Sequence, residues 1–205
     1  MTGAVAVVDR SVERGLDVYT QKVGMWVFLC SEVMFFAGLI GSYIVLRFGA
    51  SDTWAEPGQV LNVPITAVNT FILICSSVTM VKAFAAAQQG DQRGIRLFLL
   101  LTFLLGALFL SVQVVEYTEL ARHGEWAGHH GFTPAAGLYG ATFYTMTGFH
   151  GFHVLSGVTC LGWATVKAFR GHWSEHHYHG IEVLGLYWHF VDLVWIILFT
   201  VVYLI

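Results

Sequence analysis

The sequence predicts an all-α integral membrane protein, a bundle of five transmembrane helices. Of its 205 residues, 56% are hydrophobic and 11% are charged, whereas an ordinary soluble domain has roughly 25% charged residues. The apolar residues also gather into stretches of about 20 or more, the length that a helix needs to cross the hydrocarbon core of a bilayer. Short polar links separate these stretches.

The charged residues before the first apolar stretch predict a short tail. Residues 1–22 contain six charged side chains and lack the uninterrupted apolar core of a cleavable signal peptide. We therefore expect residues 1–22 to form a cytoplasmic amino-terminal tail and residues 23–205 to form the transmembrane domain.

Five stretches within that domain are expected to span the membrane. In order, they cover residues 23–48, 65–87, 95–117, 137–168 and 181–205. The fourth stretch is longer than a bilayer requires, so we expect it to tilt or to end outside the hydrocarbon.

The links between the stretches carry the glycine and proline residues that end helices. They comprise residues 56–64, 89–91, 124–134 and 171–180. All of them are too short to form additional domains. The chain also lacks an evident internal repeat, which disfavours a transporter built from inverted repeats.

The distribution of Lys and Arg predicts the orientation, because cations that flank a span are retained on the cytoplasmic side. Eight of the ten Lys and Arg residues lie in the tail or beside the second and fourth links; the two on the other side are Arg47 and Arg122. The amino terminus is therefore expected in the cytoplasm. After five crossings, the carboxyl terminus is expected outside.

Two classes of function are disfavoured by composition. The formal net charge is only −3 and no run of Lys or Arg occurs, so nucleic acid is not an expected partner. Cys30, Cys75 and Cys160 lie in three separate apolar stretches, which favours their interpretation as small buried side chains over a disulfide or a metal site.

Glu32 is the polar residue of greatest interest, because it lies within the first apolar stretch. A charged side chain at the centre of a bilayer costs about 2.5–3.5 kcal/mol, so such residues face protein and find partners. Two interpretations remain open for Glu32: a hydrogen bond to a neighbouring helix, or a role in binding lipid or handling protons.

The third stretch ends with Gln113 and Glu116, which share one helix face at a spacing of three residues. Their position near the membrane interface lowers the cost of burying them. We expect this pair to form hydrogen bonds between helices, each contributing about 1 kcal/mol.

Histidines in the last two stretches allow two interpretations. His150 and His153 share a face at a spacing of three residues, and His189 and Asp192 share a face with Glu182. A metal site would need ligands from both stretches. The spacing favours instead a polar seam of hydrogen bonds between the two helices. The linking histidines, His172, His176, His177 and His179, are expected in a solvated cytoplasmic loop.

Several segments, spread in order over all five stretches, resemble subunit III of the haem–copper oxidases, and most closely its cytochrome c oxidase branch. The resemblance lies in SEVMFFAG at residues 31–38, VNT at 68–70, QVVEY at 113–117, YGATF at 139–143, TGFHGFHV at 147–154 and YWHFVDLVW at 187–195. The last two segments are specific enough to exclude chance.

The resemblance implies a subunit without catalytic residues or bound redox metal, within a proton-pumping complex that passes electrons from cytochrome c to oxygen. Haem and copper are then expected in partner subunits: the catalytic haem–copper subunit I and the copper-bearing subunit II. The expected location is the bacterial cytoplasmic membrane, where the complex could join a larger respiratory assembly.

The resemblance also implies roles for individual residues. Glu32 is similar to a buried carboxylate that the family associates with bound phospholipid and with sustained proton uptake. The other polar positions are implied to be structural or to contact lipid: Glu116, His150, His153, Glu182, His189 and Asp192. Seven-helix members of the family have two further amino-terminal helices, which form a lipid-filled cleft with the other five.

Two alternative functions share the expected fold: subunit III of a quinol oxidase and the related subunit of nitric oxide reductase. A membrane di-iron oxygenase is a more remote alternative, because the histidines of the last link and those of the apolar stretches are expected at different depths in the membrane.

Overall fold

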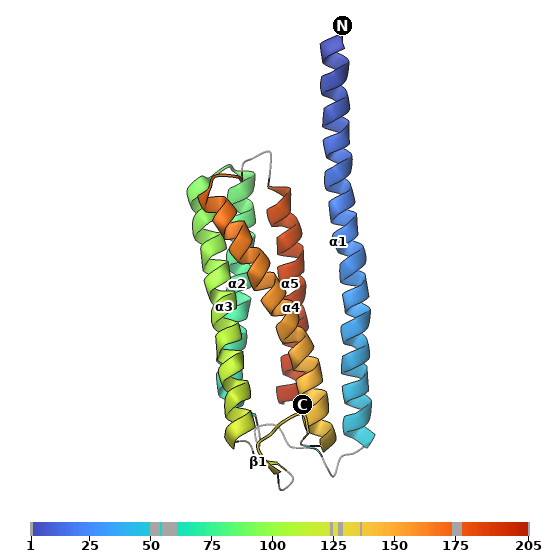
Figure 1. Ribbon diagram of the computed structural model, residues 1–205, viewed down its shortest axis with the longest axis vertical. Coiled ribbons are helices and arrows are strands. Elements are labelled where there is room, and N and C mark those ends of the chain that lie inside the picture. The colour runs from blue at the N-terminus through green and yellow to red at the C-terminus, as the bar shows by residue number, and fades with distance from the viewer. Residues whose placement is uncertain are drawn as a thin grey trace.

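The computed structural model describes residues 2–49, 54, 61–123, 125–126, 129–135, 137–173 and 178–204. Within these residues the chain forms five α-helices, one short π-helix and two very short strands (Figure 1). The elements are α1 (Thr2–Gly49), α2 (Val63–Gln88), α3 (Gln92–His123), β1 (Glu125–Trp126), β2 (His129–His130), α4 (Gly137–Phe169), α5 (His179–Phe199) and η2 (Thr200–Leu204). The all-helical prediction is confirmed.

Four helical segments are long and apolar enough to cross a membrane. They are Tyr19–Gly49, Val63–Gln88, Gln92–Arg122 and His179–Leu204. Within the described residues, α4 is not among them, although it is 33 residues long. Its sequence mixes threonine, histidine and glycine with the apolar residues, which lowers its mean hydropathy.

Local signals explain where the helices begin and end. At the start of α2, the Asn62 side chain accepts a hydrogen bond from the Ile65 amide at 3.4 Å, and a proline lies in the first turn, where its missing N–H costs nothing. Gly90 and Gly171 follow α2 and α4 with φ of 70° and 73°. This left-handed conformation favours glycine and commonly ends a helix.

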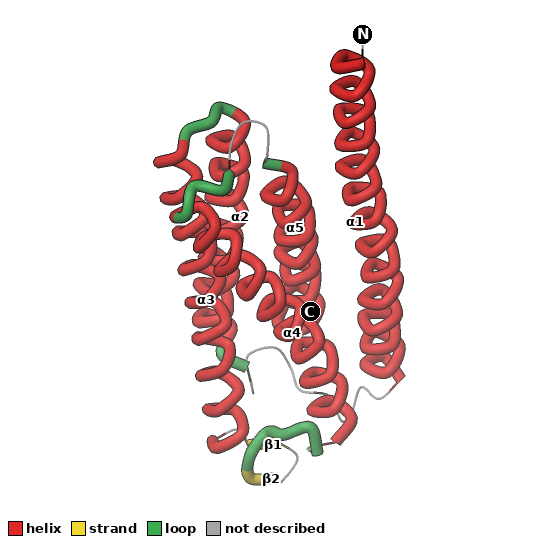
Figure 2. Tube along the Cα trace, turned by 45° about the horizontal axis from the view of Figure 1, so that its top comes forward, coloured by secondary structure: helices red, strands yellow, loops and turns green. Residues whose placement is uncertain are grey.

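The first helix is longer than its apolar stretch. Residues 2–22, expected as a tail, continue the same helix that carries the first apolar stretch. Figure 1 shows this amino-terminal part of α1 projecting beyond the other four helices. Helix α1 packs along α4 and α5, while α2, α3, α4 and α5 pack against one another (Figure 2).

Trp188 of α5 joins the four packed helices. Its indole is fully buried, and its Nε1 donates a hydrogen bond to the Ser76 hydroxyl of α2 at 3.0 Å. The ring lies against Gly106 of α3 and Gly157 of α4, so closely that a Cβ at either glycine would come within 2.7–2.8 Å of it. These two glycines therefore set how closely α3 and α4 approach α5.

Strands β1 and β2 form a small antiparallel pair in the link between α3 and α4. The link is attached to the bundle at Phe132, whose amide donates to the Leu120 carbonyl at 2.9 Å. The Phe132 carbonyl in turn accepts a hydrogen bond from the Tyr144 hydroxyl at 2.8 Å. The start of α4 is thereby fixed against the end of α3.

Candidate functional site

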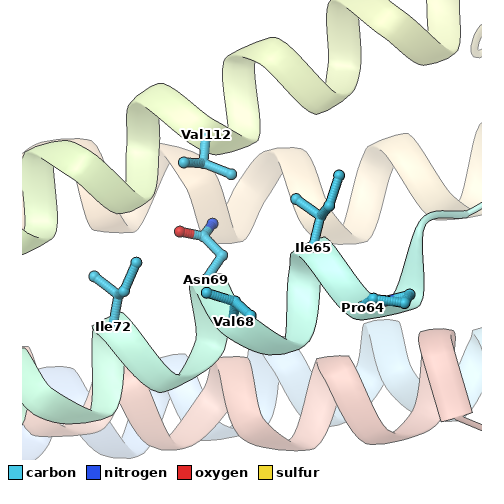
Figure 3. A pocket seen from close by; sticks show the side chains of 6 residues that line it. All are labelled: Pro64, Ile65, Val68, Asn69, Ile72 and Val112. Atoms are coloured by element: carbon cyan, nitrogen blue, oxygen red, sulfur yellow. The ribbon is translucent and has the colours of Figure 1, made fainter.

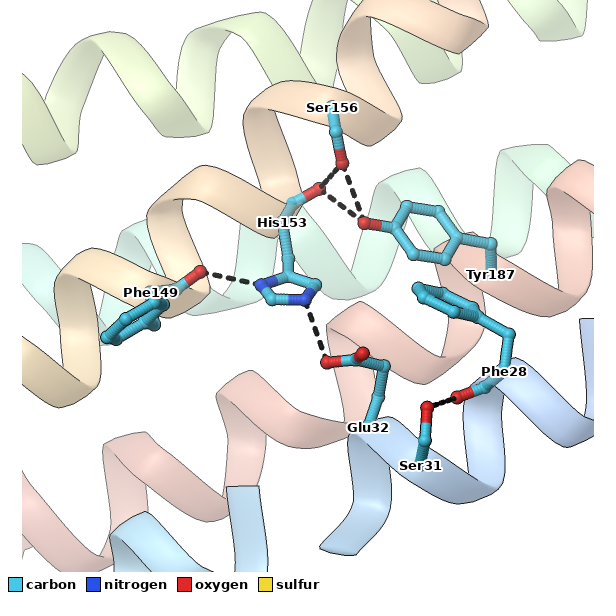
Figure 4. A network of polar contacts seen from close by, with 7 residues as sticks. All are labelled: Phe28, Ser31, Glu32, Phe149, His153, Ser156 and Tyr187. Atoms are coloured by element: carbon cyan, nitrogen blue, oxygen red, sulfur yellow. Dashed lines mark hydrogen bonds and ion pairs between the residues drawn. The ribbon is translucent and has the colours of Figure 1, made fainter. Parts of the chain in front are cut away.

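Glu32 of α1 and His153 of α4 form a direct contact inside the apolar part of the protein. The distance between Glu32 Oε2 and His153 Nε2 is 3.0 Å, and the two side chains are 17% and 13% exposed. The other ring nitrogen, Nδ1, lies 2.7 Å from the backbone carbonyl of Phe149, one turn earlier on α4. Figure 4 shows the imidazole held between these two oxygen atoms.

The carbonyl of Phe149 determines which tautomer His153 adopts. A carbonyl oxygen only accepts, so Nδ1 must carry a proton. The contact at Nε2 then requires one more proton, which resides either on the Glu32 carboxyl or on the imidazole ring. In both cases a single proton lies between Oε2 and Nε2, and its transfer from one atom to the other preserves the hydrogen bond.

Neighbouring side chains fix the position of this pair. The Tyr187 hydroxyl of α5 lies 3.0 Å from the His153 carbonyl, to which it donates, and 2.7 Å from the Ser156 hydroxyl (Figure 4). The ring of Phe36 packs edge-on against the imidazole, with 5.1 Å between centroids. The Glu32–His153 pair therefore connects α1 to the α4–α5 interface.

His150 has a different environment from His153, although both lie on α4. His150 is fully buried, and its Nε2 donates to the Val191 carbonyl of α5 at 3.1 Å. Its ring lies 4.8 Å from the Trp195 ring. Its Nδ1 has no hydrogen-bond partner among the described residues. His150 thus joins α4 to α5, whereas His153 joins α4 to α1.

The polar residues of α5 contact α2. His189 Nδ1 lies 2.6 Å from the Ser77 hydroxyl. Asp192 is buried, and its Oδ1 has no hydrogen-bond partner among the described residues. Of the residues expected along one seam between the last two helices, His150 joins α4 to α5, His153 contacts α1 and His189 contacts α2.

Glu116 and Glu182 lie in two further, separate contacts. Oε1 of Glu116 accepts from the Thr66 hydroxyl of α2 at 2.7 Å and from the Tyr203 hydroxyl of η2 at 3.3 Å. Glu182 pairs with Lys22 of α1 at 2.8 Å and with His179 at 3.6 Å. Glu116 therefore joins α2, α3 and the carboxyl-terminal turn, while Glu182 joins α5 to α1.

Among the described residues, no three His, Cys, Asp or Glu side chains lie close enough together to hold a metal ion. His172 and His179 are described, whereas His176 and His177 of the same link lie outside the described residues.

Glu32 and His153 each stand out in the sequence, but their contact was not predicted. Helical spacing shows which residues share a face of one helix, and these two residues lie 121 positions apart on different helices. No signal in a single sequence identifies such a contact.

Comparisons with known proteins match most of the chain to a single family. The family model for cytochrome c oxidase subunit III matches residues 8–205. A cytochrome c oxidase subunit 3 from Corynebacterium diphtheriae is 40% identical over 186 residues, 90% of this chain and 87% of the relative. The subunit 3 of Thermostichus vulcanus is 36% identical, over 89% of this chain and 86% of the relative. The subunit 3 of Oryctolagus cuniculus is 34% identical, over 94% of this chain and 70% of the relative.

Proposed function

The chain belongs to the cytochrome c oxidase subunit III family, and from this premise we propose that it stabilises the catalytic subunit, retains phospholipid and sustains proton uptake. A subunit III is part of an oxidoreductase complex without being its catalytic subunit. In the proposed complex, haem and copper reside in subunits I and II and cytochrome c is the electron donor.

The single observation that carries this proposal is the Glu32–His153 pair. Glu32 lies nine residues after Val23, about 14 Å along the helix and so near the middle of the bilayer. A carboxyl group at this depth is costly unless it has a partner, and His153 supplies one at 3.0 Å. The shared proton makes the pair suited to exchanging protons with a neighbouring path.

The exposed surface of α1 supports the lipid-binding part of the proposal. In the most apolar 18-residue stretch of α1, only 11% of the residues are buried within this chain. The exposed large side chains of α1 include Val27, Met34, Val45 and Phe48. An apolar surface this extensive is covered in a membrane by acyl chains or by other subunits. Phospholipid between α1 and the catalytic subunit would keep the Glu32–His153 pair away from bulk water.

We further propose that α4 is the fifth transmembrane helix. Figure 1 shows α3 ending at the opposite end of the bundle from the start of α5, with α4 joining the two ends. Because α3 and α5 are both apolar enough to cross a membrane, the connecting helix must cross as well. Its outward side chains, which include Phe152, Leu155 and Trp163, are large and apolar.

The same arrangement supports the proposed orientation. The α2–α3 and α4–α5 links lie at one end of the bundle and the carboxyl terminus lies at the other (Figure 1). Lys82, Arg93 and Lys167 flank those two links, which favours placing that end in the cytoplasm. The amino terminus would then be cytoplasmic and the carboxyl terminus external, in the cytoplasmic membrane of a bacterium.

Purification of the tagged chain in mild detergent tests its place in the complex. A reduced-minus-oxidised spectrum and metal analysis should show haem and copper that accompany other subunits. Both should be absent from this chain once it is separated from them. Iron retained by the separated chain, or no co-purifying haem protein, would contradict the proposal.

Substitution of Glu32 tests the role of the shared proton. Glu32→Gln can still donate a hydrogen bond to His153 Nε2 but carries no transferable proton, whereas Glu32→Ala removes both. We expect Glu32→Ala to lower lipid content and to shorten sustained turnover. Glu32→Gln should retain lipid and still shorten turnover.

Ser31→Ala is the matched control, because within the described residues the Ser31 hydroxyl bonds to the carbonyl of Phe28 on the same helix and to no other helix. It should leave lipid content and turnover unchanged. Wild-type turnover in Glu32→Gln would exclude the proton role and leave a structural one. Wild-type lipid content and turnover in Glu32→Ala would exclude both roles.

A further inference from the structure

Three side chains where α2 meets α5 form a polar cluster that reaches the outer surface of the protein. The Ser77 hydroxyl of α2 lies 2.6 Å from Nδ1 of His189 and also hydrogen-bonds the Asp192 side chain, one turn further along α5. Asp192 is buried, whereas Ser77 and His189 are half-buried. Nε2 of His189 has no hydrogen-bond partner among the described residues, but unlike Nδ1 of His150 it is not enclosed by the protein. This ring nitrogen is therefore open to a neighbouring molecule.

The cluster lies near the middle of the membrane on both of its helices. Along the helix axis, His189 is about 4 Å from the midpoint of His179–Leu204, and Ser77 is about 2 Å from the midpoint of Val63–Gln88. The hydrocarbon core extends about 15 Å on each side of its centre. Lipid headgroups are therefore out of reach of Nε2, and acyl chains have neither a hydrogen-bond donor nor an acceptor to offer it.

The hydrogen bonds of the cluster make Nε2 a donor in either ionisation state of Asp192. If Asp192 is protonated, its O–H points to Ser77, because Oδ1 has no partner among the described residues. Ser77 then donates its own proton to Nδ1, and the proton of the neutral ring lies on Nε2. If Asp192 is ionised, Ser77 donates to the carboxylate and Nδ1 donates to Ser77. A second ring proton, on Nε2, then compensates a charge that is costly at this depth.

Apolar side chains surround this N–H on what we call the α2–α5 surface. Leu193 and Ile196 follow His189 on the same face of α5, Ile74 and Val78 lie on α2, and all four are exposed. An N–H in such surroundings requires an acceptor, which another transmembrane helix can present as a hydroxyl or a carboxylate. Helix α5 contacts α1 as well as α2 and lies between them (Figure 2), so the α2–α5 surface lies beside α1.

The pocket on the other side of α2, facing α3, differs from the α2–α5 surface. It is shallow and lined by Pro64, Ile65, Val68, Asn69, Ile72 and Val112. Figure 3 shows the Asn69 amide among these apolar side chains. Its Nδ2 donates to the Phe109 carbonyl at 3.2 Å, and its Oδ1 is enclosed by the protein. A molecule that covers this pocket therefore meets mainly apolar atoms, for which acyl chains suffice.

We propose that a transmembrane helix of the catalytic subunit docks on the α2–α5 surface, where an acceptor on that helix binds Nε2 of His189. The inference rests on the proposed function, which packs this chain against the catalytic subunit. Because the α2–α5 surface lies beside α1, a helix docked there also encloses the phospholipid proposed to lie between α1 and the catalytic subunit.

Two substitutions separate the docking contact from the contact inside the chain. His189→Leu and Ser77→Ala both remove the hydrogen bond between these residues, but only His189→Leu removes the N–H at the surface. The haem recovered per tagged chain is measured from the reduced-minus-oxidised spectrum after purification in mild detergent, together with the amount of the chain in the membrane.

We expect His189→Leu to lower the recovered haem about fivefold, the factor that corresponds to one hydrogen bond in lipid, with an unchanged amount of the chain in the membrane. Ser77→Ala keeps the imidazole and should retain haem. His189→Gln should retain most of it as well, because its amide can present an N–H at nearly the same place.

The outcomes of this experiment are distinguishable. If the unmodified tagged chain recovers no haem, the proposed function itself fails. If the unmodified chain and His189→Leu recover haem equally, or if Ser77→Ala loses as much as His189→Leu, only the docking surface is wrong.

A photo-crosslinking residue at position 193 of the otherwise unmodified chain provides a second measurement, which leaves the polar cluster intact. Leu193 is 57% exposed and lies one turn after His189. We expect mass spectrometry to identify a peptide from a transmembrane helix of the catalytic subunit. A crosslink to lipid alone, or to a second copy of this chain, would overturn the assignment.

Discussion

Replacing Gly157 by Ala should destabilise the bundle through one identifiable clash. A Cβ at this position would lie 2.8 Å and 2.9 Å from Cζ3 and Cε3 of Trp188, and 3.3 Å from Cε1 of Tyr187. Trp188 cannot retreat easily, because it is fully buried and a second close approach, at Gly106, confines it from α3. The added methyl group must therefore push α4 away from α5.

The size of the effect follows from the cost of overpacking a close-packed interior, about 1–3 kcal/mol. For a chain of this length, that cost corresponds to a decrease of about 2–12 °C in the melting temperature. The decrease can be followed by intrinsic tryptophan fluorescence of the purified complex during heating.

Gly148→Ala on the same helix is the matched control, because in the described part of the chain no atom outside its own helical turn lies within 4 Å of the added Cβ. Alanine is a better helix former than glycine, so this control should leave the melting temperature unchanged or raise it. Equal melting temperatures for Gly157→Ala and wild type would refute the conclusion that Trp188 packing sets the distance between α4 and α5.

Two other predictions concern hydrogen bonds between helices. His189→Leu should lower the stability of the bundle by about 1 kcal/mol by removing the contact with Ser77. Ser77→Ala should cost at least as much, because Ser77 also hydrogen-bonds the Asp192 side chain, and the double variant should cost no more than Ser77→Ala; additive losses in thermal melting would argue against a direct interaction. Glu116→Leu leaves the buried Tyr203 hydroxyl without its acceptor, whereas the Thr66 hydroxyl can still donate to the Asn62 carbonyl; the substitution should cost about 1–3 kcal/mol. Glu116→Gln keeps an acceptor oxygen and should cost less; equal losses in the two variants would contradict this account.

The helices were the most predictable part of the structure, because each apolar stretch is close to the length of a spanning helix. The extension of α1 back to Thr2 was not predicted. Residues 2–22 are too charged to be recognised as a span, yet helix formation depends on backbone propensity as well as apolarity. Once a helix is nucleated in the apolar stretch, adding residues to its end is much easier than starting a new helix.

The contacts of the candidate site were less predictable than its residues. His150 and His153 share a face by spacing, but three residues correspond to a rotation of about 300°, which leaves their side chains about 60° apart. That difference directs His150 to α5 and His153 to α1. Sequence spacing alone does not show which neighbouring helix occupies each direction.

The measurement that tests the central claim most directly is a double-mutant cycle on the rate at which the purified oxidase loses activity during turnover. The cycle compares wild type, Glu32→Gln, His153→Leu and the double variant at equal haem content. If the two side chains act through one shared proton, each single variant should lose activity faster than wild type and the double variant no faster than either single one. Loss rates equal to wild type in all variants, or losses that add in the double variant, would contradict the claim that the Glu32–His153 pair sustains the activity of the complex.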